Sequence, residues 1–297
     1  MNGILRSKDG ATDVKTGPPV ERIRKQLASV AGEQVSKGLP RGYQRLGDIL
    51  LLRLRKDAIA FGPTIGKLYQ DELGVSTVLA FERVGKGPER APSVQLLAGT
   101  KTETTVRDGG VSWTLDAASL LFSAGNMEER HRVVKLVRPG EKVVDLFAGI
   151  GYFAIPAAKL GHASEVYAVE KNPVSFAYLE RNIIVNRVKG KVRALCGDNR
   201  TVPLPPEHFD RAFLGYLPSA LPFVRRATGL IAPSGGWLHV HTVASVRMRE
   251  KTLAIVETNI RLAGRRPGRL SLRRVKSYGP SRDHVVVDAC IAPKEEP

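Results

Sequence analysis

Apolar residues in the second half of the chain recur as short β-branched or aliphatic runs separated by segments of helical period. Such alternation is typical of a parallel sheet covered by helices on both faces. The strands predicted in this way cover residues 143–147, 164–169, 191–195, 210–214, 236–242, 269–276 and 284–291. A helix is predicted at 219–231, between the fourth and fifth strands. Only residues 277–283 separate the last two, which is too short for a parallel crossover, so these two should form an antiparallel pair. The pattern predicts a doubly wound, seven-stranded, Rossmann-like α/β domain.

The first half of the chain has a different pattern. Residues 1–36 are polar and include a charged, modestly amphipathic segment, which predicts a flexible arm or one loosely docked helix. Short strand-like runs around a helical segment at 63–73 follow. We expect a small α+β domain at 37–115 that docks substrate, and the α/β domain at 116–297.

A glycine-rich turn joins the first strand of the α/β domain to the next helix, in the run KVVDLFAGIGYFAIP at 142–156. Gly149 and Gly151 remove side chains that would block a ligand, and Asp145 lies where the strand ends. The second strand delivers Glu170 at its carboxyl end, where a carboxylate can hold both ribose hydroxyls of an adenosine. The turn predicts a site for a nucleotide-like cofactor.

Two cofactors fit this turn, because the two glycines, Ala154 and a later acid also satisfy the loose NAD fingerprint. Three further features favour S-adenosylmethionine. Asp145 precedes the turn, the pair Asp198-Asn199 follows the third strand, and the strongly basic chain is not explained by an anionic dinucleotide. The glycines alone leave the choice open.

The 297 residues carry a formal net charge of +17, which indicates a polyanionic partner. Residues 261–276 contain no acid. The basic residues of this segment are Arg261, Arg265, Arg266, Arg269, Arg273, Arg274 and Lys276. Because arginine forks suit phosphate oxygens, the segment predicts salt-sensitive nucleic-acid binding. A positive field does not distinguish RNA from DNA, and a solvated basic face without a partner is the alternative.

Membrane and metal signals are both missing from the sequence. No window of about 18 apolar residues occurs and the amino terminus has no apolar signal segment, so we expect a cytoplasmic protein. Cys196 and Cys290 are far apart and no histidine cluster accompanies them, which favours small core residues over metal ligands. Hydrophobic residues make up 42% of the chain, enough for the cores of two domains.

A family resemblance is carried by the segments FSAGNMEER, VVDLFAGIGYFAIP, YAVEKNP, GDNR, LGYLPS and LHVH. Together they look like the archaeal and eukaryotic aminocarboxypropyltransferases of wybutosine synthesis, which act on 4-demethylwyosine at position 37 of tRNA. The match runs from about Leu46 to the carboxyl terminus. The tRNA guanine-37 N1-methyltransferases form a sister family that shares the fold and most of these motifs.

The end of the fourth strand distinguishes the two branches. The methyltransferase branch places Asn-Pro-Pro or Asn-Leu-Pro there, whereas this chain has LGYLPS at 214–219 without the asparagine. The resemblance implies that Gly215 and Tyr216 reshape the substrate pocket, so that Cγ of the cofactor rather than its methyl carbon faces the acceptor. A plain rim or core aromatic is the alternative role for Tyr216.

The resemblance also implies how S-adenosylmethionine is held. The implied contacts are Glu170 with the ribose, Asp198 and Asn199 with the adenine end, Ser123 and Arg130 with the methionine end, and Asp145, Gly149 and Gly151 along the turn. From spacing alone, Ser123 would be an ordinary helix cap and Arg130 a surface ion-pair partner.

The implied reaction is an in-line displacement in which a carbon of the tricyclic base at position 37 of tRNA(Phe) attacks Cγ and methylthioadenosine leaves. A proton must leave that carbon, and Glu129 is the predicted general base because its match in the methyltransferase branch has that role. The basic segment and the domain before residue 115 are expected to cooperate in binding the tRNA. Guanine-37 N1-methylation and a non-catalytic RNA-binding protein are the alternatives.

Three further polar residues are expected to have local roles. His239 and His241 are two apart on a strand and share a face. A hydrogen-bonded pair in the core or on the surface is favoured, and a position facing the cofactor or base is the alternative. Arg200 is expected to form a local salt bridge rather than to clamp a base.

Overall fold

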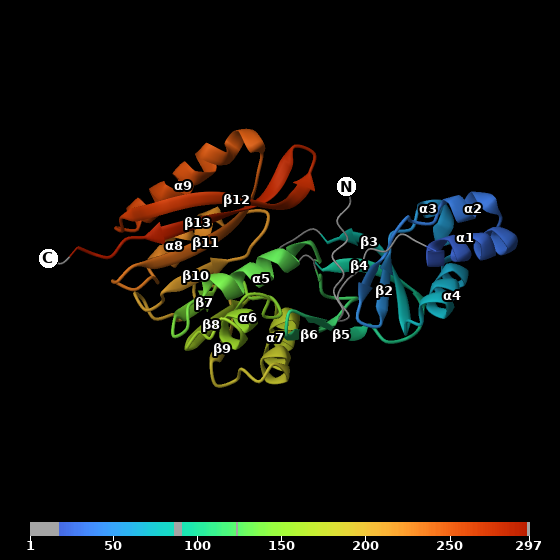
Figure 1. The fold of residues 1–297 in the computed structure, drawn as a ribbon, viewed down its shortest axis with the longest axis horizontal. Coiled ribbons are helices and arrows are strands. Elements are labelled where there is room, and N and C mark those ends of the chain that lie inside the picture. Colours follow the sequence, from blue (N-terminus) through green and yellow to red (C-terminus); the bar gives the residue numbers. More distant parts are fainter. Residues whose placement is uncertain (1–17, 86–90, 123, 296–297) are drawn as a thin grey trace. The chain divides into compact units, whose positions relative to one another are not determined.

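The computed structural model describes residues 18–85, 91–122 and 124–295 and divides into two compact units, Met1–Phe122 and Ser123–Pro297 (Figure 1). The division differs from the boundaries expected at 36 and 115. The helical segment of the predicted arm is part of the first unit, and the second unit begins after Phe122. Residues 1–17 of that arm lie outside the described residues.

The first unit packs helices against one face of a sheet with the strand order β1-β2-β3-β4. Its helices are α1 (Pro18–Ala31), α2 (Glu33–Lys37), α3 (Lys56–Ile59) and α4 (Gly62–Leu73). Its strands are β1 (Gln44–Leu46), β2 (Ile49–Leu52), β3 (Thr77–Val84), β4 (Pro92–Ala98) and a separate hairpin of β5 (Glu103–Asp108) and β6 (Val111–Asp116). The helix and strands expected here are therefore present.

Helix α1 belongs to the core of the first unit. Ile23 and Leu27, one turn apart, are fully buried in the same cluster as Ile65 and Tyr69 of α4. Burying each aliphatic side chain contributes roughly 1.5–3 kcal/mol. The segment expected as a flexible arm or loosely docked helix is thus an integral helix, because its amphipathic face is covered.

The described residues of the second unit build a seven-stranded sheet in the order β12-β13-β11-β10-β7-β8-β9 (Figure 1). The strands are β7 (Lys142–Asp145), β8 (Glu165–Glu170), β9 (Val192–Cys196), β10 (Arg211–Leu214), β11 (Gly236–Ala244), β12 (Pro267–Gly279) and β13 (Arg282–Ile291). Strands β7 to β11 pair in parallel, and β13 is antiparallel to both β11 and β12. The predicted α/β fold and its closing antiparallel pair are confirmed. The strand order reverses between β7 and β10, which is where open α/β sheets bind ligands.

The helices of the second unit are α5 (Met127–Leu136), α6 (Ala154–Lys159), α7 (Pro173–Val185), α8 (Val224–Thr228) and α9 (Arg249–Leu262). Asn172 begins α7, since its Oδ1 accepts a hydrogen bond from the Val174 amide at 2.8 Å. The helix expected at 219–231 is shorter, because Pro218 and Pro222 lack amide hydrogens. A 3₁₀ turn at Leu221–Phe223 therefore precedes α8.

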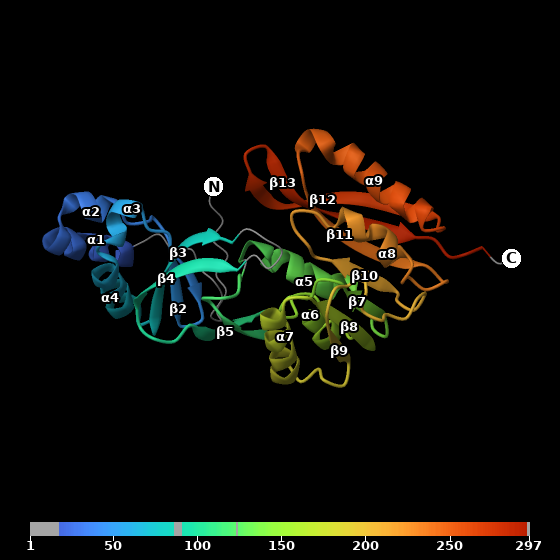
Figure 2. The same ribbon diagram turned by 180° about the vertical axis from the view of Figure 1, so that it is seen from behind.

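The two faces of this sheet differ in polarity. Leu238 and Val240 of β11 belong to an apolar cluster with residues of α8 and α9. In both views α9 runs alongside β12 (Figure 2). The alternating residues His239 and His241 are buried on the opposite face, which α5 approaches through Glu129 and Arg132. The polar residues around Glu129 and His239 lie along this face of the sheet.

No helix in the described ranges combines the length and apolar content that a bilayer crossing requires.

Candidate active site

The turn after β7 needs glycine at two positions. Gly149 and Gly151 have φ angles of +57° and +102°, which side chains rarely adopt. A Cβ on Gly151 would lie 2.4 Å from Cδ1 of Ile155, and one on Gly149 would lie 3.1 Å from the Tyr152 ring. The turn is therefore a cradle that a side chain would fill, at the carboxyl end of the strand beside the order reversal.

Glu170 is fixed at the end of β8 by two backbone amides. Its Oε2 accepts a hydrogen bond from the Gly149 amide at 2.7 Å, and its Oε1 accepts one from the Asn172 amide at 2.7 Å. Burial raises the pKa of Glu170, although these amides oppose the rise. Each oxygen keeps a further lone pair for a ligand hydroxyl. This geometry suits the predicted ribose contact.

Asp145 ends β7 with a fully buried carboxyl group. Its Oδ1 accepts a 3.2 Å hydrogen bond from the Phe147 amide, while Oδ2 makes no hydrogen bond to any described residue. Burial raises the pKa of Asp145 to about 7, even though nearby backbone amides lower it. The amides that lower it belong to Phe147 in the turn and to Phe153 and Ala154 at the start of α6. Asp145 therefore supports the glycine turn from inside the protein.

Asp198 and Asn199 follow β9 in different environments. Hydrogen bonds from the Arg200 guanidinium, at 2.6 and 2.9 Å, and from Lys171 at 3.0 Å hold the pKa of Asp198 well below its usual range. Arg200 is thus the local salt-bridge partner that the sequence predicts. Asn199 is buried and donates to the Leu146 carbonyl at 3.2 Å, bracing the turn. Adenine contacts by both residues stay predictions.

The methionine-end prediction named two residues. Ser123 lies outside the described residues. Arg130 is only 2% exposed, and its guanidinium carbon lies 4.4 Å from the ring centroid of Tyr152 in the glycine turn. Arg130 is therefore not a surface ion-pair residue. Its position beside the turn suits a cofactor carboxylate.

The end of β10 carries an aromatic cluster. The Tyr216 ring stacks on Phe147 with centroids 5.0 Å apart, and Phe223 meets Phe147 edge-on at 4.9 Å. A Cβ on Gly215 would come within 2.7 Å of the Phe153 ring. The Leu217–Pro218 peptide is cis. Gly215 and Tyr216 thus shape the strand ends beside the turn, and their contact with substrate stays a prediction.

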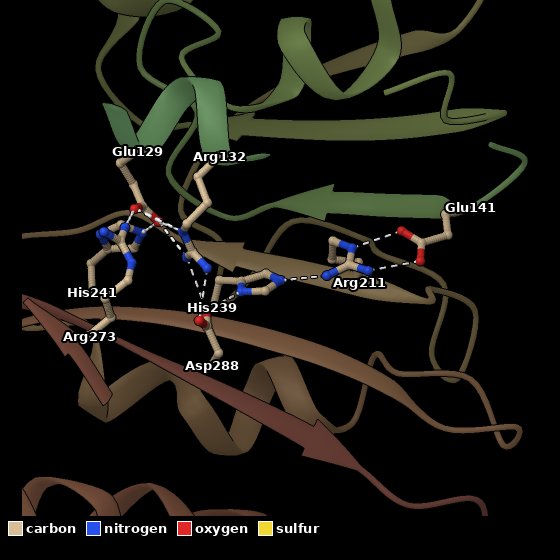
Figure 3. Close-up of polar contacts among 8 residues, drawn as sticks. All are labelled: Glu129, Arg132, Glu141, Arg211, His239, His241, Arg273 and Asp288. Carbon is tan, nitrogen blue, oxygen red and sulfur yellow. Dashed lines mark hydrogen bonds and ion pairs between the residues drawn. The ribbon is translucent and has the colours of Figure 1, made fainter. Parts of the chain in front are cut away.

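Glu129 is buried in an ion-pair network (Figure 3). Arg132 donates to its carboxylate at 2.5 and 3.0 Å, Arg273 donates to Oε2, and His241 Nε2 lies 3.9 Å from Oε1. Arg132 also donates to both oxygens of Asp288, at 2.8 and 3.0 Å. To accept a proton, the Glu129 carboxylate must exchange one of these guanidinium partners. The general-base role stays a prediction.

His239 continues the network with a defined tautomer (Figure 3). Arg211 Nη1 lies 2.7 Å from its Nε2, and arginine can only donate, so the imidazole proton is on Nδ1 and is donated to Asp288 at 2.6 Å. Burial lowers the pKa of His239 to about 4. Burial opposes the shift of Asp288, but His239 and Arg132 bring its pKa to about 2. Arg211 in turn binds Glu141 through two hydrogen bonds of 2.7 and 2.8 Å.

His241 and His284 form a second buried pair. His241 Nδ1 lies 2.9 Å from His284 Nε2, and the His241 ring stacks on Phe153 at 5.3 Å. Burial lowers the pKa values of both imidazoles. The expectation of hydrogen-bonded core histidines on one face is confirmed. The sequence analysis missed Arg211 and Asp288, which contact His239, and Arg132, which joins Asp288 to Glu129.

The depressed pKa of His239 predicts acid sensitivity. The unfolded chain binds a proton on His239 near pH 6.5 and the folded protein only near pH 4, so lowering the pH across this window favours unfolding. The window is worth up to roughly 3 kcal/mol. His239→Asn should lose this part of the pH dependence in denaturant titrations. The raised pKa of Asp145 acts in the opposite sense, but Asp145 is present in both proteins and so cancels in the comparison. If the free energy of unfolding depended on pH equally in wild type and variant, His239 would not be the source of the acid sensitivity.

The basic segment 261–276 is not one continuous patch. Arg265 is buried and donates to the carbonyls of Ile231, Ala232 and Ala292 at 2.9–3.1 Å, so its predicted phosphate contact is replaced by a structural role. Arg273 pairs with Glu129. The remaining local ion pairs are Arg261 with Glu257, Arg266 with Glu295 and Arg274 with Asp283. Arg269 is exposed, and Lys276 is half-buried.

The cysteines differ from the expectation. Cys196 is exposed and Cys290 is half-buried, so neither is a core residue. Both lie at or next to the last residue of a strand, and β9, which Cys196 ends, is an edge strand of the sheet. The described residues contain no cluster of His, Cys, Asp and Glu that could hold a metal ion.

Comparison with known proteins gives a consistent picture. The TRM5/TYW2 methyltransferase domain matches residues 104–263, and the TYW2 N-terminal domain matches residues 23–102. A tRNA(Phe) (4-demethylwyosine(37)-C(7)) aminocarboxypropyltransferase from Pyrococcus horikoshii is 36% identical over 269 residues, 90% of this chain and 95% of that relative. The Methanocaldococcus jannaschii enzyme of the same name is 34% identical over 250 residues, 83% of this chain and 96% of that relative. The crystal structure of P. horikoshii TYW2 in complex with MeSAdo superposes with a TM-score of 0.82, at 33% identity, over 92% of this chain and 99% of that chain.

The Rossmann-like sheet, the glycine cradle and the fixed carboxylate after β8 define an S-adenosylmethionine-dependent transferase. The chain belongs to the TRM5/TYW2 family. Its N-terminal domain match and its relatives place it with the TYW2 aminocarboxypropyltransferases.

Proposed function

We propose that this protein transfers the 3-amino-3-carboxypropyl group of S-adenosylmethionine to C7 of 4-demethylwyosine at position 37 of tRNA(Phe). The observation that carries the proposal is the match of nearly the whole chain, including the TYW2 N-terminal domain, to relatives named for this reaction. The segment LGYLPS, which lacks the asparagine of the methyltransferase branch, supports the same choice.

The sulfonium of S-adenosylmethionine makes its Cγ electrophilic. The transfer forms a bond between C7 of the base and Cγ, breaks the Cγ–S bond with its electron pair going to sulfur, and releases the proton from C7. Glu170, oriented by two amides, is suited to hold the ribose hydroxyls. Arg130, stacked on Tyr152, is suited to hold the carboxylate of the group that moves. Fixing both ends selects the carbon that meets the base, because small misplacements cost large rate factors.

The test uses the full chain with S-adenosylmethionine labelled in its carboxypropyl carbons and tRNA(Phe) carrying 4-demethylwyosine. We expect the label in the tRNA and methylthioadenosine in solution. S-adenosylhomocysteine with a labelled methyl group on guanine-37 would identify the methyltransferase reaction instead. Tight tRNA binding without either small product would identify a non-catalytic binding protein.

Glu129→Gln tests the predicted base. Removing a general base typically lowers the rate by about 10²–10⁴-fold, so single-turnover transfer should fall by about a hundredfold or more. Glu128→Gln is the matched control, because Glu128 is the exposed neighbour of Glu129 on α5 and is not a predicted base. A full single-turnover rate in Glu129→Gln, or an equal loss in the control, would contradict the base assignment.

Other finer expectations stay predictions. These are the docking of the tRNA anticodon loop by the domain before residue 115, the absence of a metal requirement and a cytoplasmic location.

A further inference from the structure

The strand directions divide the basic residues of the second unit between the two ends of the parallel strands. We call the side of their carboxyl ends the cofactor edge and the side of their amino ends the opposite edge. Parallel pairing places the carboxyl ends of β10 and β11 at the same edge as the glycine turn after β7. Because β13 is antiparallel to β11, Asp283 at its start pairs with Ala244 at this cofactor edge, and Ile291 at its end pairs with Gly236 at the other. The two edges are about 30 Å apart, the length of a ten-residue strand.

A basic rim follows the cofactor edge. We define it as residues Val246–Arg249, which form a 3₁₀ turn and the first residue of α9, and Arg274–Arg282, around the β12–β13 turn. The rim contains no acid, and its basic residues are Arg247, Arg249, Arg274, Lys276 and Arg282. Asp283 joins the two segments, since its carboxylate lies 2.9 Å from Arg274 and 3.7 Å from Arg249.

The rim also exposes apolar and aromatic side chains among these cations. Val246, Met248 and Tyr278 are 61%, 42% and 37% exposed. Charges on an edge strand alone would be explained by protection against strand pairing between molecules. Exposed aromatic and thioether groups beside them are not needed for that protection. Cations that track phosphates, interleaved with a ring on which a base can stack, are the usual construction of an RNA-binding surface.

The rim adjoins the candidate active site. Lys276 lies so close to Gly125 that a Cβ there would come within 3.1 Å of its Nζ, and Gly125 precedes the helix that carries Arg130. Arg273, next to the rim in β12, reaches Glu129 of that helix. An RNA strand held on the rim is thus delivered to the edge where the cofactor is expected.

We propose that this rim binds the phosphate backbone of the substrate tRNA next to the modified nucleotide, with Tyr278 stacking on a neighbouring base. The proposal rests on the proposed function for the identity of the RNA. It leaves out Arg261, Arg265 and Arg266, which line a cavity of about 560 Å³ with Lys294 at the opposite edge.

The experiment compares two variants of the full chain that each lose two positive charges. One is Arg247→Gln/Arg282→Gln in the rim, and the other is Arg261→Gln/Arg266→Gln at the opposite edge. All four side chains are exposed, so both variants should fold. Binding to tRNA(Phe) carrying 4-demethylwyosine is measured between 50 and 200 mM salt, roughly the range where counterion release is well resolved. Calorimetry with S-adenosylmethionine checks that the cofactor site is unchanged.

The rim variant should bind tRNA about tenfold or more weakly, with the salt slope reduced by about 1.5 to 2, while the opposite-edge variant binds as wild type. Tyr278→Ala should lose about tenfold in affinity with an unchanged salt slope, because stacking carries no counterions. Equal losses in both double variants, or none in the rim variant, would overturn the proposal. So would equal effects of the rim variant on tRNA and on duplex DNA. Failure of the proposed reaction is distinguishable, since it appears in the small product and not in the contrast between the two edges.

Discussion

Replacing Gly151 with alanine is expected to weaken S-adenosylmethionine binding by about ten- to a hundredfold. Alanine at a φ of +102° is strained by roughly 1–3 kcal/mol, and its Cβ would collide with Ile155 at 2.4 Å. The turn relieves both by moving, which also displaces the Gly149 amide from Glu170. The loss is measured by calorimetry with the cofactor in the absence of tRNA.

The chain offers a matched control in Gly190→Ala. Gly190 has nothing within 4 Å of a built Cβ and no positive φ, so its replacement should leave cofactor affinity unchanged. If Gly151→Ala bound the cofactor as tightly as Gly190→Ala, the turn would not be the cofactor cradle.

Replacing Asp288 with alanine is expected to lower the free energy of unfolding by about 3–5 kcal/mol. Asp288 accepts from His239 and Arg132. Its removal leaves the buried His239 N–H without its acceptor, and the half-buried Arg132 guanidinium keeps only Glu129. Breaking a buried ion pair by removing one partner is costly for this reason. Equilibrium unfolding in denaturant at neutral pH gives the value.

Asp71→Ala serves as the comparison for Asp288→Ala. Asp71 forms an exposed pair with Lys67 at 2.8 Å, one turn apart on α4, and such pairs are worth about half a kcal/mol. A similar small loss for both variants would mean that the contacts of Asp288 contribute no more to the free energy of unfolding than an exposed ion pair.

The sequence predicts the second unit well, because its signals are local. Strands of β-branched residues, the glycine turn and the short connection at 277–283 each depend on neighbours in the chain, and all are found. The helix after β10 is shorter than its apolar pattern predicts, because the pattern continues across Pro222 although proline lacks the amide hydrogen that a helix needs. The helix at 18–31 was underestimated, since its docking depends on partners in α4 far along the chain.

The site was predicted residue by residue but not as a network. Local motifs identify Asp145 and Glu170. Glu129, however, is held by Arg132 of its own helix and by Arg273 of β12, and His241 of β11 lies 3.9 Å from it. The basic segment misled for a different reason. Register shifts in β12 between Pro267 and Leu270 and between Arg274 and Lys276 break the alternation that would show which arginines share a face. Arg265, before the strand, turns inward and is invisible to a count of charges.

The polar contacts that Asp288 makes with His239 and Arg132 also restrict how the strands of the second unit can pair. In the native register Asp288 lies directly opposite His239, and the apolar Ala289 lies opposite Leu238. A shift of β13 by one residue would turn Asp288 into the apolar cluster. The His239 Nδ1–H and the N–H groups of Arg132 that now face Asp288 would then lose this acceptor. Competing pairings of the long hairpin are therefore penalised during folding, even where the native ion pairs themselves add little net stability.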